Sequence, residues 1–164
     1  MAGLEDLYRE IILDHYRNPR NRGDLPVPPA RRVEGFNPLC GDEVVVFVEL
    51  HGDDVADVRI AGQGCSISQS SASMMSAAIK GRSIDQVRAL IRAFKAMMSI
   101  HEHRLDGDGH EVAEAVLPDP GVPMGDLEAL RGVVKFPVRI KCATLSWNTL
   151  EQALDDADAE AQAS

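Results

Sequence analysis

One segment constrains the fold of this chain more than any other, the six-residue sequence Asn37-Pro38-Leu39-Cys40-Gly41-Asp42. Pro38 fixes its own φ and biases the residue before it towards extended backbone. Gly41 can adopt a positive φ that other residues resist, so Cys40 and Asp42 can converge on one point. The β-branched run at 44–50 predicts a strand. The thiol and the carboxylate should therefore stand at the entrance of a rigid element.

This turn supplies two of the four ligands that a zinc ion prefers. The chain has two further cysteines, Cys65 and Cys142, and we expect Cys40, Asp42, Cys65 and Cys142 to meet around one metal ion. The cysteine spacings are long and no Cys-x-x-Cys pair occurs, so spacing alone is a weak signal for zinc. Three unrelated buried thiols are the alternative. The glycine-rich turns around Cys40 and Cys65 count against that alternative.

Composition limits the classes of protein to consider. The chain has 164 residues, of which 45% are hydrophobic, which fits a single domain over 1–164 with a sizeable core. Aromatic residues make up 4% and the net charge is −9, which disfavours nucleic acid or an anionic membrane as a partner. No apolar run has the length of a membrane span and no signal peptide begins the sequence, so we expect a cytoplasmic protein. Three cysteines make a poor disulfide framework, which favours metal binding or catalysis in a reducing compartment.

The hydrophobic pattern predicts an α+β fold. Apolar residues recur at helical spacing over 4–17, and Asn18-Pro19 ends that helix. Three short strands joined by turns predict an antiparallel meander. The predicted strands cover 31–36, 44–50 and 55–60. The remaining predicted helices cover 66–80, 84–98 after a capping box at Ser83-Ile84-Asp85-Gln86, short segments at 111–116 and 126–130, and a final stretch at 144–154.

The second and third cysteines each have a distinctive local context. Cys65 follows two glycines and precedes a helix, where backbone N–H groups and the helix dipole favour a thiolate. Cys142 follows the run 133–141, which we expect to be extended, and lies at or beside the start of the last helix. Arg139 and Lys141 flank Cys142 and could balance the charge of a metal–thiolate site. Ordinary surface cations on a strand are the alternative, for Lys141 above all.

The rest of the chain carries weaker signals. We expect an irregular insertion at 103–124, with His101, His103 and His110 in or beside it. These histidines suggest a second metal site, but a solvated surface segment fits their loop-forming neighbours better. The acidic, alanine-rich stretch 155–164 is expected to fray. His15, at the end of the first helix, is more consistent with a packed side chain than with a ligand.

Most of the chain resembles the U-type iron–sulfur cluster assembly proteins (IscU/NifU N-terminal-like), and within them the zinc-dependent SufU subgroup. The matching stretches are Leu7-Tyr8-Arg9, Asp14-His15-Tyr16-Arg17-Asn18-Pro19-Arg20-Asn21, the turn at 37–42, Gly62-Gln63-Gly64-Cys65-Ser66-Ile67-Ser68, Ala72-Ser73-Met74-Met75, and Phe136-Pro137-Val138-Arg139-Ile140-Lys141-Cys142-Ala143-Thr144-Leu145-Ser146-Trp147.

The resemblance implies a SufE/NifU-like fold, a three-stranded antiparallel sheet with helices packed on one face. It implies zinc on Cys40, Asp42, Cys65 and Cys142. It also implies a sulfurtransferase role, in which Cys40 accepts persulfide sulfur from a PLP-dependent, SufS-type cysteine desulfurase for downstream iron–sulfur scaffold proteins. Arg139 matches a position that the family uses near the site. In this scheme partner binding displaces one zinc ligand and frees Cys40, and a partner histidine can take the vacated place.

Two alternatives stay open. A scaffold would assemble a [2Fe–2S] cluster on the same four residues, since thiolates suit both metals. A zinc-stabilised adaptor would activate a desulfurase without accepting sulfur, so enzyme status is left open. Scaffold relatives carry a histidine where this chain has Lys141, and a Leu-Pro-Pro-Val-Lys motif where it has Phe136-Pro137-Val138-Arg139. Both differences favour the SufU type.

Overall fold

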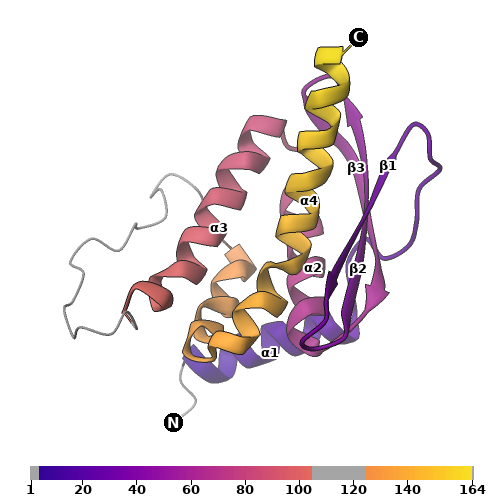
Figure 1. The fold of residues 1–164 in the computed structure, drawn as a ribbon. Coiled ribbons are helices and arrows are strands. Elements are labelled where there is room, and N and C mark those ends of the chain that lie inside the picture. Colours follow the sequence, from indigo (N-terminus) through magenta and orange to yellow (C-terminus); the bar gives the residue numbers. More distant parts are fainter. Residues whose placement is uncertain (1–3, 105–124, 164) are drawn as a thin grey trace.

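The computed structural model describes residues 4–104 and 125–163, which form a sheet covered by helices (Figure 1). The elements, in order, are α1 (Leu4–Arg17), β1 (Arg31–Asn37), β2 (Asp42–His51), β3 (Asp54–Gln63), α2 (Ser66–Ile79), α3 (Ile84–Arg104), the 3-10 helix η1 (Gly125–Lys135) and α4 (Pro137–Ala163). None of the helices within these ranges is long and apolar enough to cross a membrane.

Within the described ranges, three strands form one antiparallel sheet in the order β1-β2-β3. Asn37 pairs with Asp42 at the turn end of β1 and β2, and Val46 lies opposite both Val33 and Ile60. Val46 and its neighbours two residues away on β2, Val44 and Val48, are buried, as the two-residue side-chain period of a strand requires. The predicted antiparallel meander is confirmed.

The helices of residues 4–104 and 125–163 all lie on one side of this sheet (Figure 1). Helices α2 and α4 contact the sheet, α1 packs on α2, and α3 packs on α4 and η1. The core between these layers is apolar, and Trp147 of α4 stacks on Phe94 of α3 with ring centroids 4.4 Å apart. The predicted α+β class with helices on one face is therefore confirmed.

Helix α2 is unusual because its buried side is rich in serine. Ser71 donates a hydrogen bond to the backbone oxygen of Ala143 (2.6 Å) and accepts one from the indole N–H of Trp147 (3.1 Å). These bonds satisfy polar groups that would be costly to bury unpaired. They also hold α4 against α2 at Ala143, the residue directly after Cys142.

His15 is a packed histidine in the structure. Its side chain is buried, with Nδ1 2.8 Å from Ser73 Oγ and Nε2 2.9 Å from Asp126 Oδ2. It therefore ties α1 to α2 and to η1, the element that leads into α4. The expectation that it packs rather than binds a metal agrees with these contacts.

The structure differs from the sequence expectations around Cys142. The run 133–141 is not extended: η1 covers most of its first part, and α4 begins at Pro137. Proline suits the first turn of a helix, because its fixed φ is helical and its missing N–H is not needed there. Arg139, Lys141 and Cys142 are thus helical residues, and Cys142 lies in the second turn rather than at the helix start.

Two other boundaries differ. Helix α4 continues to Ala163, so the expected fraying over 155–164 is not what the structure shows up to that residue. Ion pairs hold this end: Arg88 binds Asp155 (3.0 Å) and Asp158 (2.7 Å), and Arg31 binds Glu160. Helix α3 reaches Arg104, beyond the predicted end near 98. The expected insertion at 103–124, with His110 and the segment 111–116, otherwise lies outside the described residues.

Stability should depend on the absence of a side chain at Gly35. A Cβ there would lie 2.0 Å from Thr149 Oγ1 and 3.2 Å from Leu145 Cδ1, because β1 packs directly on α4. We expect Gly35→Ala to lower the free energy of unfolding by about 1–3 kcal/mol, the usual cost of overpacking. Gly132→Ala is the control, since a Cβ at that position meets nothing within 4 Å. Equal stability of the two variants in denaturant titrations would contradict this packing.

Candidate functional site

The turn between β1 and β2 presents Cys40. The Cys40 N–H lies 3.4 Å from the backbone oxygen of Asn37, and Gly41 has φ +67°. The positive φ explains the glycine, since L residues with a side chain are strained in that region. Cys40 is half-buried at the tip, and Asp42, the first residue of β2, is fully buried.

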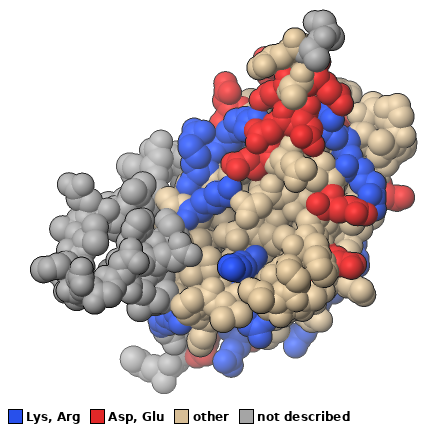
Figure 2. Space-filling model, in the orientation of Figure 1, with Lys and Arg blue, Asp and Glu red and all other residues tan. Residues whose placement is uncertain are grey.

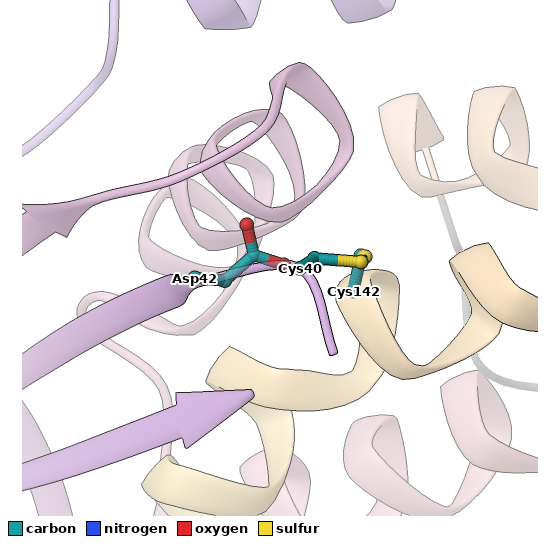
Figure 3. A group of neighbouring side chains, drawn as sticks. All are labelled: Cys40, Asp42 and Cys142. Carbon is teal, nitrogen blue, oxygen red and sulfur yellow. The ribbon is translucent and has the colours of Figure 1, made fainter. Parts of the chain in front are cut away.

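Cys142 meets this turn from the second turn of α4. Its sulfur lies 3.3 Å from the sulfur of Cys40. One ligand atom each from Cys40, Asp42 and Cys142 lies within 4.8 Å of the others. Figure 3 shows the two sulfurs side by side and the Asp42 carboxylate at the start of its strand. Residues separated by a hundred positions therefore form one cluster.

Cys65 lies against the same carboxylate. Asp42 Oδ1 accepts a 2.8 Å hydrogen bond from the Cys65 N–H, and the Cys65 sulfur is 3.8 Å from Asp42 Oδ2. Cys65 is also the N-cap of α2, where its sulfur accepts from the Ser68 N–H at 3.5 Å. The cap is the thiol itself, which places it at the positive end of the helix dipole.

The glycine before Cys65 permits this approach. A Cβ at Gly64 would lie 2.5 Å from Asp42 Oδ1 and 2.7 Å from Ser68 Oγ. Only glycine lets the backbone pass this close to the buried carboxylate. The glycine directly before Cys65 is thus explained by the contact between β2 and the start of α2.

The donor set suits a thiophilic divalent metal. Zinc binds thiolates at about 2.3 Å in a tetrahedral arrangement, and the three clustered ligand atoms are close enough to share one ion. Asp42 Oδ1 is already occupied by the Cys65 N–H, which leaves Oδ2 for a metal. The predicted four-residue ligand set stays a prediction, with Cys40, Asp42 and Cys142 in one group and Cys65 in contact with Asp42.

Burial of Cys142 and the neighbouring cation Arg139 have opposite effects on the charge of the thiols. Burial raises the pKa of the Cys142 thiol well above its usual range, and hydrogen bonds with Cys40 and Asp42 raise it further. A buried thiol of this kind becomes a thiolate when a cation compensates its charge. The pKa of Arg139 is raised by the nearby Cys65 and by a hydrogen bond to Cys142. The predicted cation Arg139 therefore reaches the thiols from the first turn of α4. Arg139 and Lys141 are both exposed on that helix.

Sequence reasoning missed one polar residue of the cluster. The Asn37 side-chain amide lies 3.7 Å from the Cys142 sulfur. The signal was present in the sequence, because an asparagine opens the turn that carries Cys40. Its partner could not be deduced, since the segment before Cys142 was expected to be extended.

The fold is a β-meander covered by helices on one face. Three thiols and a carboxylate gather at one end of it, which is the donor set of a metal–thiolate site. The sequence model for the NifU-like N terminal domain matches residues 7–118, and the chain belongs to that family.

Relatives of the chain carry two kinds of name. The zinc-dependent sulfurtransferase SufU of Bacillus subtilis (strain 168) is 44% identical over 153 residues, covering 93% of this chain and 92% of the relative. The iron–sulfur cluster assembly scaffold protein IscU of Streptococcus pyogenes serotype M1 is 35% identical, covering 94% and 86%. A crystal structure of FiSufU, a candidate scaffold protein for the SUF system from Fervidobacterium islandicum AW-1, superposes with a TM-score of 0.70 at 30% identity, covering 93% and 99%. The predicted family resemblance is confirmed.

Metal affinity should depend on the charge of Asp42. Asn at this position keeps an oxygen for the Cys65 N–H but loses the anionic oxygen, so Asp42→Asn should fold and bind Zn²⁺ at least about tenfold more weakly, ~1.4 kcal/mol. Chelator competition measures this affinity. Asp54→Asn, the same change at the exposed far end of the sheet, is the control. Unchanged zinc affinity in Asp42→Asn would exclude the carboxylate as a ligand.

Proposed function

We propose that this chain is a zinc-dependent sulfurtransferase, a carrier that accepts sulfur from a PLP-dependent, SufS-type cysteine desulfurase and passes it into iron–sulfur cluster assembly. The observation that carries the proposal is the position of Cys40. Its thiol is half-buried on a turn tip, 3.3 Å from the buried Cys142 sulfur and beside the Asp42 carboxylate. Similarity to the SufU relative over nearly the whole chain supports it.

Cys40, Asp42, Cys65 and Cys142 are the proposed zinc ligands. When bound, zinc keeps these sulfurs deprotonated at neutral pH without redox chemistry of its own. The protein supplies the rest: Asp42 is locked by the Cys65 N–H, and Cys142 is fixed within α4. Cys40 is the thiol of a turn, which makes it the one best placed to leave the cluster and react.

The transfer step is a thiolate exchange. The Cys40 thiolate attacks the outer sulfur of the persulfide on the desulfurase cysteine. The new S–S bond forms at Cys40 as the old one breaks, and the desulfurase cysteine leaves as a thiolate with the electron pair. Arg139, whose guanidinium reaches the thiols, is placed to offset the negative charge of the incoming persulfide and of the new Cys40 persulfide.

Exposed apolar side chains close in sequence to Cys40 and Cys142 are the surface proposed to bind the desulfurase. Among the described residues with large exposed apolar side chains, four lie within six residues of Cys40 or Cys142, namely Phe36, Leu39, Phe136 and Val138. We call these four the apolar collar. On the face in Figure 2, acidic side chains gather near the C-terminal end of α4, whereas the region over its beginning and the β1–β2 turn is mostly uncharged. Exposed apolar side chains on the segments that carry Cys40 and Cys142 suit the binding of a partner that delivers a persulfide.

A [2Fe–2S] scaffold is the second candidate function. The IscU relative supports it, and three thiolates and a carboxylate can also hold iron. Metal analysis of protein purified without reconstitution separates the two: one zinc and no colour supports the carrier, and a brown iron protein supports the scaffold. In either case the reducing cytoplasm is the proposed location, since free thiols persist there.

The sulfur acceptor should be Cys40. After mixing with the desulfurase and cysteine, we expect peptide mass analysis to find one added sulfur on Cys40, and Cys40→Ala to lose sulfur acceptance completely. The reason is that no other thiol of the site stands on a turn tip. The exposed His51→Ala is a control that should accept sulfur normally. Full persulfide transfer to Cys40→Ala would overturn the assignment.

The apolar collar should set the affinity for the desulfurase. Leu39 is 68% exposed, so Leu39→Ser should leave folding intact. Burial of such a side chain contributes roughly 1.5–3 kcal/mol, so we expect the dissociation constant, measured calorimetrically, to rise tenfold or more. Val27→Ser, which removes an exposed apolar side chain from the loop before β1, should change it little. Equal affinities of both variants would place the interface elsewhere.

A further inference from the structure

Asn37 contacts both the turn that carries Cys40 and the helix that carries Cys142. Its backbone pairs with Asp42 at the end of the sheet, and its backbone oxygen lies 3.4 Å from the Cys40 N–H. Its side-chain Oδ1 accepts from the Leu39 N–H at 3.3 Å, and its Nδ2 lies 3.7 Å from the Cys142 sulfur. One buried side chain thus joins the turn of Cys40 to the helix of Cys142.

The orientation of this amide is fixed by its partners. A backbone N–H must meet the amide oxygen, because an NH₂ group facing the Leu39 N–H would set two donors against each other. The NH₂ group therefore faces the Cys142 sulfur. A hydrogen bond from an amide to a thiolate is charge-assisted and stronger than one between neutral groups.

The two adjacent thiols are consequently unequal. Cys142 is buried in a helix and has the Asn37 amide as a donor. For Cys40, no amide or hydroxyl of the described residues donates to the sulfur; the contact found is the one with Cys142. An amide donor lowers the charge density of the Cys142 sulfur and holds it in place, whereas the Cys40 sulfur keeps its nucleophilicity and its freedom to move.

From this asymmetry we infer that Asn37 is a positioning residue that anchors Cys142 and thereby selects Cys40 as the thiol that accepts sulfur. The inference rests on the proposed sulfur-carrier function. Asn37 itself touches neither the donor nor the transferred sulfur. It acts through the geometry of the turn and through the Cys142 sulfur.

Two substitutions separate these contacts. Asn37→Asp keeps an oxygen for the Leu39 N–H but loses the donor to Cys142, and Asn37→Ala loses both. Asn148→Asp makes the same chemical change at an exposed position of α4 and is the control. Protein loaded with Co²⁺ reports on the thiolates directly, because its sulfur-to-metal charge-transfer bands respond to hydrogen bonds at the sulfur.

In Asn37→Asp we expect shifted charge-transfer bands and a fall in Zn²⁺ affinity of roughly 10–100-fold, the usual effect of removing an outer-shell partner. After mixing with the desulfurase and cysteine, peptide mass analysis should find part of the added sulfur on Cys142, whereas the unaltered protein and Asn148→Asp carry it on Cys40 alone. Asn37→Ala should behave similarly, with a lower melting temperature.

The inference is overturned if folded Asn37→Asp keeps the bands, the zinc affinity and the exclusive labelling of Cys40. Effects in Asn37→Ala alone would also overturn it, since they would trace to the Leu39 contact of the turn. If the unaltered protein accepts no sulfur, the proposed function fails, while the Co²⁺ bands of Asn37→Asp still decide whether the amide acts on Cys142.

Discussion

The arrangement of the site depends on one buried carboxylate. Asp42 begins β2, and its Oδ1 accepts the N–H of Cys65, the residue that caps α2. This bond joins the sheet to the first turn of a helix that packs on the sheet, on α1 and on α4. A buried carboxylate is tolerated only with strong partners, so the interaction constrains both elements and requires glycine at position 64. A metal held by the same carboxylate would stabilise this junction further.

The second constraint is the position of α4. It is fixed by polar contacts inside the core: Ser71 of α2 binds the backbone of Ala143 and the indole of Trp147, and Gly35 lets β1 approach Thr149 directly. These contacts hold Cys142 opposite the β1–β2 turn. The serines of α2, which look out of place in a core helix, therefore help to position a cysteine at the other end of the sequence.

Sequence reasoning predicted the meander, the first helix and the capping box of α3, because each has a local signal; the box is present as reciprocal bonds between Ser83 and Gln86. It also predicted that Cys40, Asp42, Cys65 and Cys142 meet around one metal ion. The structure brings Cys40, Asp42 and Cys142 together and places Cys65 against Asp42, while their role as metal ligands stays a prediction. Sequence reasoning was wrong about 133–141, where β-branched residues favoured a strand and Pro137 instead starts a helix. It missed the Asn37 contact, because a side chain's distant partner depends on how α4 packs and not on local pattern.

The proposed function depends on one zinc ion that joins Cys40, Asp42, Cys65 and Cys142. Anomalous diffraction from crystals of protein purified without added metal, recorded on both sides of the zinc absorption edge, tests it most directly. We expect one zinc peak bonded to the three sulfurs and to Asp42 Oδ2. A zinc-free cluster, or an ion bound elsewhere with Cys65 outside its coordination sphere, would contradict it.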